Sequence, residues 1–370
     1  MKRIILSLLC IAALCACTND DQYELSDFVG SDTLTIHYNQ QSATFGTLPY
    51  FVTATAAGAH VTVTSFTGKN LVIRLSGSSE DGSLIVFSNR KYAIDLNGLT
   101  LTNPKGPAIN NQCGKSLIIT TVGVNTLTDN APYINTTINT NGDTIQQKGT
   151  LFSEGQIYFR GNGTLNINGN ARNGIASDDY ITFESGIINI NMAATATNGV
   201  KANDGVFIQG GSLNIDVTAD GARGIRNEAR MVITGGTTNI TTSGDCKIET
   251  LDGIADTTSC AGIKCDSLFT MSAGTLTITS TGDGGKGINA AEDFLFSGGT
   301  LDVQATGTES EGKPKAVKSD TGIILSGGSF HAYSRKSKAV DNAGDELPTI
   351  VGTPNQTSLK LTKREVNVVF

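Results

Sequence analysis

Residues 199–217 read GVKANDGVFIQGGSLNIDV, and residues 262–280 read GIKCDSLFTMSAGTLTITS. Aligned on the first glycine as position zero, both stretches have apolar residues at +7, +9, +14 and +16, and glycine at +12. The pattern recurs six times between Asn173 and Asp341, with Thr238 at +14 and Ala332 at +16 as its weak members. The residues at position zero are Gly174, Gly199, Gly224, Gly262, Gly287 and Ala316.

This pattern alternates apolar and polar residues in short pieces that glycine interrupts, which indicates three short strands in each repeat. The spacings between zeros are 25, 25, 38, 25 and 29 residues. One repeat is too short to bury its own apolar row, so the repeats must stack. We therefore predict an all-β chain that forms a right-handed parallel β-helix, a solenoid of about 25 residues and three strands per coil. A propeller or sandwich would need hairpin turns that the pattern lacks.

The N-terminus predicts export and lipid anchoring. Lys2 and Arg3 precede an apolar run that is too short to span a bilayer. The run ends in LCAC, which resembles a bacterial lipobox with Cys17 as the lipidated residue. The alternative is ordinary signal cleavage after Ala16. Asp20 and Asp21 follow, as in a surface-export tag, so we expect an outer-membrane lipoprotein at the cell surface.

The remaining chain divides by its patterning. The alternating runs before the coils predict a β cap over the first coil, and the final residues predict a second cap. The predicted segments are a signal peptide (1–16), a tether (17–32), an N-terminal β cap (33–64), the parallel β-helix (65–345) and a C-terminal cap (346–370).

Composition excludes several functions. The formal charge of the 370-residue chain is −7 and no Lys/Arg cluster stands out, which argues against a nucleic-acid partner. Its histidines, His37, His60 and His331, lie in unrelated contexts, which argues against a zinc site or a Ser-His-Asp triad. We expect a monomer.

The cysteines after the leader are Cys113, Cys246, Cys260 and Cys265. Cys246 and Cys260 bracket the longest insertion, where a disulfide would contribute about 3 kcal/mol by loop entropy. Cys265 occupies a position that holds small residues in other repeats. The pattern alone leaves the pairing open.

Several stretches resemble a bacterial carbohydrate-binding β-helix family that includes polygalacturonate- and cellulose-binding proteins. They are NGLTLTNPKGPAIN, NTLTD, GTLNINGNARNGIASDDYITF and VKANDGVFIQGGSLNI, within a resemblance that spans residues 60–345. The resemblance implies a pectate-lyase-like fold, calcium binding and a binding rather than catalytic role. Where family repeats often read DDGI, this chain reads RNGI, TNGV, ARGI, CAGI and GKGI.

Position +2 should point outward because +1 points inward. The basic residues at +2 are Lys201, Arg226, Lys264 and Lys318. We identify them as candidate carbohydrate-binding residues, because cations can hold uronate carboxylates. Acids follow at +4 or +5, so the alternative is a surface ladder of charges that neutralise one another.

The long insertions, 241–261 and 304–315, all precede position zero, and this edge is acidic. Calcium takes six to eight oxygen ligands from carboxylates and carbonyls, which such loops can supply. The candidate metal ligands are Asp178, Asp179, Asp204, Asp220, Asp252 and Asp283. The alternative for each aspartate is a turn-forming residue.

Three functions remain open at this point. The first is non-catalytic binding of an acidic, uronate-containing polysaccharide with calcium. It ranks above cellulose binding because the chain has no Trp for sugar stacking. The second is a pectate-lyase-like polysaccharide lyase, with Lys201, Lys264 or Arg226 as the base. The third is a structural surface adhesin.

Overall fold

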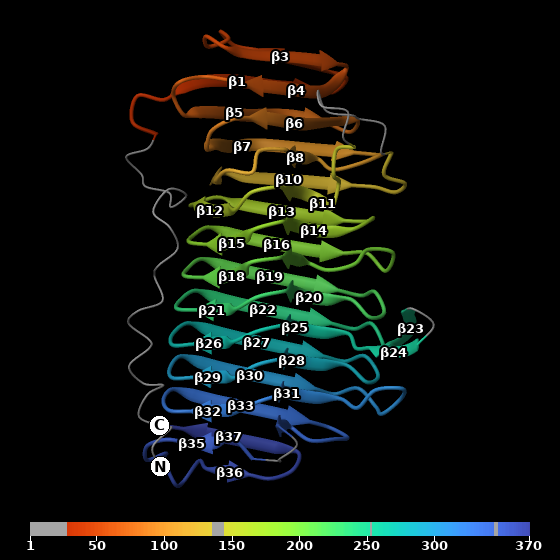
Figure 1. The fold of residues 1–370 in the computed structure, drawn as a ribbon, viewed down its shortest axis with the longest axis vertical. Helices are drawn as coiled ribbons and strands as arrows, with labels where there is room; N and C mark the ends of the chain where they lie inside the picture. The colour runs from red at the N-terminus through yellow and green to blue at the C-terminus, as the bar shows by residue number, and fades with distance from the viewer. Residues whose placement is uncertain (1–27, 135–143, 252–253, 344–346) are drawn as a thin grey trace.

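The computed structural model describes residues 28–134, 144–251, 254–343 and 347–370. Over these residues the chain is all-β and winds into a stack of coils along the longest axis of the molecule (Figure 1). The predicted parallel β-helix is confirmed. The described residues include no helix that is long and apolar enough to cross a membrane.

The first face of the solenoid is a sheet of 12 strands in the described part of the chain. β3 (Val52–Ala57) pairs antiparallel with β4, and the other strands follow one another in parallel. These are β4 (Ala59–Ser65), β6 (Gly82–Ser88), β8 (Ile109–Asn111), β11 (Gly149–Ser153), β14 (Asn173–Ser177), β17 (Val200–Ala202), β20 (Arg223–Asn227), β25 (Ala261–Cys265), β28 (Lys286–Ala290), β31 (Lys315–Ser319) and β34 (Val340–Asn342).

The second and third faces belong to one continuous sheet. The second face consists of β9 (Leu117–Val122), β12 (Ile157–Gly161), β15 (Tyr180–Phe183), β18 (Gly205–Ile208), β21 (Met231–Ile233), β26 (Phe269–Met271), β29 (Phe294–Phe296), β32 (Ile323–Leu325) and β35 (Thr349–Ile350). The third consists of β10 (Val124–Asp129), β13 (Thr164–Gly169), β16 (Ile187–Met192), β19 (Ser212–Val217), β22 (Thr237–Thr242), β27 (Thr275–Ser280), β30 (Thr300–Ala305) and β33 (Ser329–Ser334). The strands β5 (Leu71–Ser79) and β7 (Tyr92–Asn103) run across both faces in the first coils.

The apolar positions of the repeat fill the interior as columns. The residues at +1, +7 and +9 are almost fully buried, as Ile225, Met231 and Ile233 show. Like residues stack between coils, and the rings of Phe269 and Phe294 lie parallel with their centroids 4.5 Å apart. The interior is therefore a continuous dry core, and each coil depends on its neighbours for burial.

The glycine at +12 has positive φ in all six repeats, as the sequence pattern predicts. At Gly211 φ is 72°, and a Cβ there would lie 2.7 Å from the carbonyl oxygen of Gly186 in the preceding coil. A larger residue would be strained by its backbone conformation and by this contact, so glycine is required at the corner.

Both ends of the solenoid add antiparallel strands. In the segment predicted as an N-terminal cap, β1 (Asp32–Asn39) and β4 pair in parallel with β5 and β6, and so continue the coils. β2 (Ser42–Phe45) and β3 pair with them in antiparallel fashion. At the other end, β37 (Glu365–Val369) pairs antiparallel with β33 and with β36 (Lys360–Leu361).

Long connections gather at the corner between the third and first faces (Figure 1). One carries the hairpin of β23 (Lys247–Leu251) and β24 (Ile254–Thr258), which projects from this side of the stack (Figure 1). The disulfide considered for this insertion is wrong, because all four described cysteines are free. Cys260 is buried beneath the corner, whereas the Cys246 sulfur lies 3.1 Å from the Ser310 hydroxyl.

Candidate functional site

The predicted cationic residues share one column on the outer surface of the first face. Parallel register places Lys201 beside Arg226, and Arg226 beside Lys264. Asn289 follows Lys264, and Lys318 follows Asn289. The structure therefore brings the four candidate carbohydrate-binding residues into one line along the solenoid axis.

Each cation of this +2 column also contacts a carboxylate. The ion pairs are Lys201–Glu228 at 3.0 Å, Arg226–Asp266 at 2.5 Å, Lys264–Asp266 at 2.8 Å, and Lys318–Asp320. Burial opposes the charge of Asp266, but hydrogen bonds from Lys264 and Arg226 outweigh it and lower the pKa of this carboxyl. The alternative interpretation of a self-neutralised charge ladder therefore describes these contacts well.

A second basic column lies at position −1, and the sequence pattern did not predict it. It contains Arg223, Lys286 and Lys315, with Ala261 between the first two. Strict alternation would assign −1 and +1 to the same face, but position zero also faces the interior: a Cβ on Gly224 would lie 2.4 Å from Ile240 Cγ2, so −1 is left on the outside. The recurrence of Arg or Lys before the glycine was the available signal.

We call the two columns together the cationic face. Its residues are Lys201, Arg223, Arg226, Lys264, Lys286, Lys315 and Lys318. The −1 column differs from the +2 column in its charge balance: among the described residues, neither Arg223 nor Lys286 forms an ion pair. Within the part of the chain that the structure describes, the buried Arg223 Nε has no hydrogen-bond partner, and the Lys286 ammonium donates only to the Ser259 hydroxyl.

The local field of the −1 column is positive. Burial, and then the charge of Arg226, lowers the pKa of Arg223 despite the attraction of Glu249. Burial followed by repulsion from Lys318 lowers the pKa of Lys286. Crowded, partly buried cations of this kind have a surplus of positive charge that an incoming anion would relieve.

Lys315, in the next coil, also has a lowered pKa. It forms an ion pair with Asp341, and Lys338 lies 3.6 Å from the other oxygen of that carboxylate. Burial and the repulsion of Lys318 and Lys286 nevertheless lower the pKa of Lys315 to about 8. The ammonium is therefore easily deprotonated, unlike an ordinary surface lysine.

The cationic face ends where the chain covers the sheet. At the preceding +2 positions, Ala176 and Phe152 are 1% and 0% exposed. The Lys148 ammonium lies 5.4 Å from the centroid of the Phe152 ring and 2.5 Å from Asp178. Asp178, a predicted metal ligand, is thus held in an ion pair over this part of the face.

The predicted metal ligands at the corner form a hydrogen-bonded column. Asp220 Oδ1 accepts from the Asp245 backbone at 2.9 Å, and Asp245 Oδ1 accepts from the Asp283 backbone at 2.7 Å. Asp283 Oδ1 accepts from Thr308 at 2.7 Å, and this backbone hydrogen bond lowers the pKa of Asp283. Each of these aspartates therefore accepts a hydrogen bond from a backbone N–H in the turn of the next coil, which is the turn-forming role given above as the alternative to metal binding.

The other predicted metal ligands lie apart from this column. Asp179 Oδ1 accepts from the Tyr180 backbone at 2.8 Å, and Asp204 is exposed. Asp252 lies outside the described residues. Within the described ranges, no three His, Cys, Asp or Glu side chains come together as a metal site.

Comparisons with known proteins agree with this architecture. A search of curated proteins gave no match. Among solved structures, the chain is similar to a polysaccharide lyase-like protein from C. thermocellum, solved as a gadolinium derivative. The two share 22% identity with a TM-score of 0.57, over 72% of this chain and 97% of that one. At this identity the likeness shows the fold alone.

The sequence itself matches a protein family. The family model is described as carbohydrate-binding domain-containing protein, and it matches residues 57–224 and 216–308. These matches include most of the coils and the N-terminal part of the cationic face, through Arg226 and Lys264 to Lys286. The chain belongs to this family of carbohydrate-binding domain-containing proteins.

Proposed function

We propose that the protein is a non-catalytic binder of acidic, uronate-containing polysaccharide, and that the chain lies along the cationic face. Membership of a carbohydrate-binding family supports polysaccharide as the ligand class. We choose an acidic glycan because the cationic face consists of Lys and Arg side chains, which attract carboxylates.

The observation that carries the proposal is the crowding of Arg223, Lys286 and Lys315 in one column, where Lys315 alone has an ion pair, with Asp341. Burial and then repulsion from neighbouring cations lower their pKa values, and an anion placed beside them would offset both effects. Uronate carboxylates along a polymer present anions at regular intervals, and charge-assisted hydrogen bonds to Arg and Lys are among the strong ones. The column thus fits a linear polyanion better than a single small anion.

The net charge of −7 opposes such a ligand at long range. Salt screens that repulsion beyond about 8–10 Å at ordinary ionic strength, so the contact depends on the local cations. A neutral glucan would have little to gain here, because the chain has no Trp for stacking and the cationic face is built from Lys and Arg.

We also propose that a calcium ion bridges the protein and the glycan. The described acids offer single carboxylates rather than a protein cage, which fits an ion shared with the ligand and not one enclosed by the protein. Exposed Asp204, and the second oxygens of Asp220 and Asp283, could supply the protein side of such a bridge.

The proposed location is the outer membrane, with Cys17 lipidated and the solenoid displayed at the cell surface. The lipobox-like LCAC and the following acidic pair support it. Cys17 lies outside the described residues. Acyl chains contribute about 0.8 kcal/mol per buried methylene, which is enough for firm anchoring by several chains.

One observation favours a lyase as the second candidate. A lysine whose pKa is about 8 is a better general base than an ordinary lysine, and Lys315 has this property. A lyase would release unsaturated uronide ends, which absorb in the ultraviolet, whereas a binder would not. A structural adhesin is the third candidate and would bind no glycan.

A polysaccharide array, run with calcium and again with chelator, tests the three together with the absorbance assay. The proposal predicts retention of uronate polymers, weaker retention after chelation, and no absorbance change. A rise in absorbance would establish the lyase. Failure to retain any glycan would leave the adhesin.

A further inference from the structure

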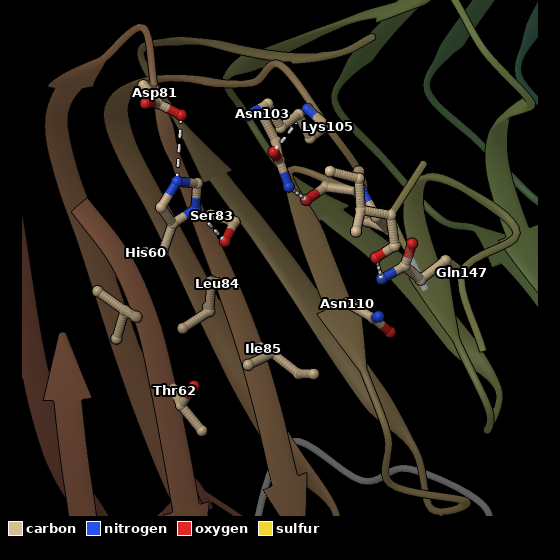
Figure 2. A pocket seen from close by; sticks show the side chains of 14 residues that line it. His60, Thr62, Asp81, Ser83, Leu84, Ile85, Asn103, Lys105, Asn110 and Gln147 are labelled. Atoms are coloured by element: carbon tan, nitrogen blue, oxygen red, sulfur yellow. Dashed lines mark hydrogen bonds and ion pairs between the residues drawn. The ribbon is translucent and has the colours of Figure 1, made fainter. Parts of the chain in front are cut away.

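A pocket opens at the N-terminal end of the first face, over strands that precede the cationic face. Figure 2 shows the side chains that line it. Its volume is about 360 Å³. It lies over β4, β6 and β8, between the turn at residues 103–107 and the chain segments at Ile134 and Gln147. This size is at the lower end of the range for small-molecule sites, about 300–1,000 Å³, and suits one or two sugar units.

One wall of the pocket is a fixed polar chain. His60 Nδ1 lies 2.9 Å from the Ser83 hydroxyl, and His60 Nε2 lies 3.1 Å from Asp81 Oδ1 (Figure 2). Ser83 is the cross-strand partner of His60 in the parallel register of β4 and β6. Both ring nitrogens are therefore engaged, and the imidazole is held in one orientation beside the pocket.

The opposite wall is a turn that Asn103 organises. Its side-chain amide donates to the Pro107 carbonyl at 2.7 Å, and its oxygen accepts from the Lys105 backbone at 3.0 Å (Figure 2). The Lys105 side chain is exposed on this turn and, among the described residues, forms no ion pair. A preorganised turn thus presents an unneutralised ammonium at the rim.

Gln147 supplies the observation that points to a ligand. Among the described residues, its buried Oε1 has no hydrogen-bond partner, and its Nε2 makes only a 3.4 Å contact with the Ile134 carbonyl. A buried acceptor without a donor costs free energy, and such groups are rare in native structures. A hydroxyl from a molecule in the pocket would satisfy this oxygen.

The floor between the walls mixes apolar and polar groups. Ile85 and Thr62 are partly exposed there, whereas Leu84 is fully buried in the core beneath them. Sugars combine an apolar face of C–H groups with a rim of hydroxyls, so the Ile85 side chain among polar neighbours matches their shape. Lys105 adds a preference for a sugar that carries a carboxylate.

We propose that this pocket binds a terminal uronic acid unit of the same class of glycan, an inference that depends on the proposed function. Lys105 holds the carboxylate, Gln147 Oε1 accepts from a hydroxyl, and Ile85 packs against the ring. From β8, the last strand beneath the pocket, to β17, which carries Lys201, there are three strand spacings of about 4.8 Å, and the covered stretch at Phe152 and Ala176 lies between. The pocket is therefore a site separate from the cationic face.

Isothermal titration of the full mature protein with digalacturonate tests this, with the neutral galactose disaccharide as the comparison ligand. Lys105→Ala and Gln147→Leu should each weaken digalacturonate binding by tenfold or more, with unchanged thermal unfolding. Lys105→Arg should retain most of the affinity. Lys105→Ala should also remove the preference for digalacturonate over the neutral disaccharide. Unchanged affinity in both loss variants would overturn the proposal.

The variant Arg223→Gln/Lys286→Gln separates this test from the proposed function. It should lose retention of the polymer and still bind digalacturonate. If the wild-type protein retains polygalacturonate but does not bind digalacturonate, the pocket is wrong and the proposed function stands. If the protein binds neither ligand, both proposals are wrong.

Discussion

Lys286 and Lys315 are cross-strand neighbours in the parallel register of β28 and β31, so two partly buried ammonium groups occupy adjacent coils of one column. Burial and then repulsion from Lys318 lower the pKa of both lysines, and Lys286 lowers that of Lys315 further. Such an arrangement destabilises the free protein, and it becomes favourable when an anion lies across it.

The first prediction concerns pH. Because the pKa of Lys315 is about 8, its ammonium is charged below that pH and neutral above it. Affinity for polygalacturonate should therefore fall as pH rises from about 7 to about 9, a range in which an ordinary lysine stays charged. Lys315→Arg should bind with little pH dependence over this range. A wild-type affinity that is flat across it would contradict the assignment.

The second prediction is that removing the charge of Lys286 stabilises the folded protein and weakens its binding to the polymer. The pKa of Lys286 is lowered in the folded protein, so its charge penalises folding below that pKa, and the penalty disappears as pH approaches the unfolded value of about 10.4. Lys286→Met should stabilise the protein at neutral pH by about 0.5–2 kcal/mol. It should stabilise less at high pH, and should weaken polymer binding. Lys69→Met, at an exposed turn, is the control and should change neither quantity.

The third prediction tests the stacked core. Ile233 is 1% exposed and lies beneath β21, whereas its neighbour Val232 points outward on the same strand. Ile233→Asp buries an unpaired carboxylate at a cost of several kcal/mol, and the stack should unfold. Val232→Asp should leave the far-ultraviolet circular dichroism and melting temperature close to wild type. Equal tolerance of both variants would mean that the side chains do not alternate as described.

The fourth prediction concerns lipidation. Cys17→Ala should abolish palmitate incorporation and release the protein from the membrane fraction, because the acyl chains supply the anchor. Cys246→Ala, which changes a free cysteine of the solenoid, should leave labelling and fractionation unchanged. Retention of the Cys17→Ala protein on membranes would rule out the lipobox. Protease treatment of intact cells would then distinguish surface display from a periplasmic location.

The repeat made most of the fold predictable. Glycine at +12 and apolar residues at +7 and +9 recur because the corner needs positive φ and the interior needs a continuous core. These are local requirements that each coil repeats, so the pattern is visible in a single sequence. The insertions were harder, because the contacts of Cys246 and Cys260 depend on how a corner loop folds against other coils.

The candidate site was only half predictable. The +2 column followed from alternation, but alternation failed at the glycine, because positions zero and +1 both face the interior and Arg223 and Lys286 lie outside them. Nothing in the repeat indicated that Phe152 and Ala176 are covered. The unpaired acceptor of Gln147 depends on three-dimensional contacts that a linear pattern does not contain.

The most direct test of the central claim is the affinity of purified protein for polygalacturonate, measured for Arg223→Gln/Lys286→Gln beside wild type. Lys69→Gln/Lys360→Gln removes the same charge from exposed positions outside the cationic face and is the matched control. We predict that the first variant loses affinity by tenfold or more and that the control changes little. Equal affinity in both variants would contradict it, because the polymer would then bind elsewhere or through net charge alone.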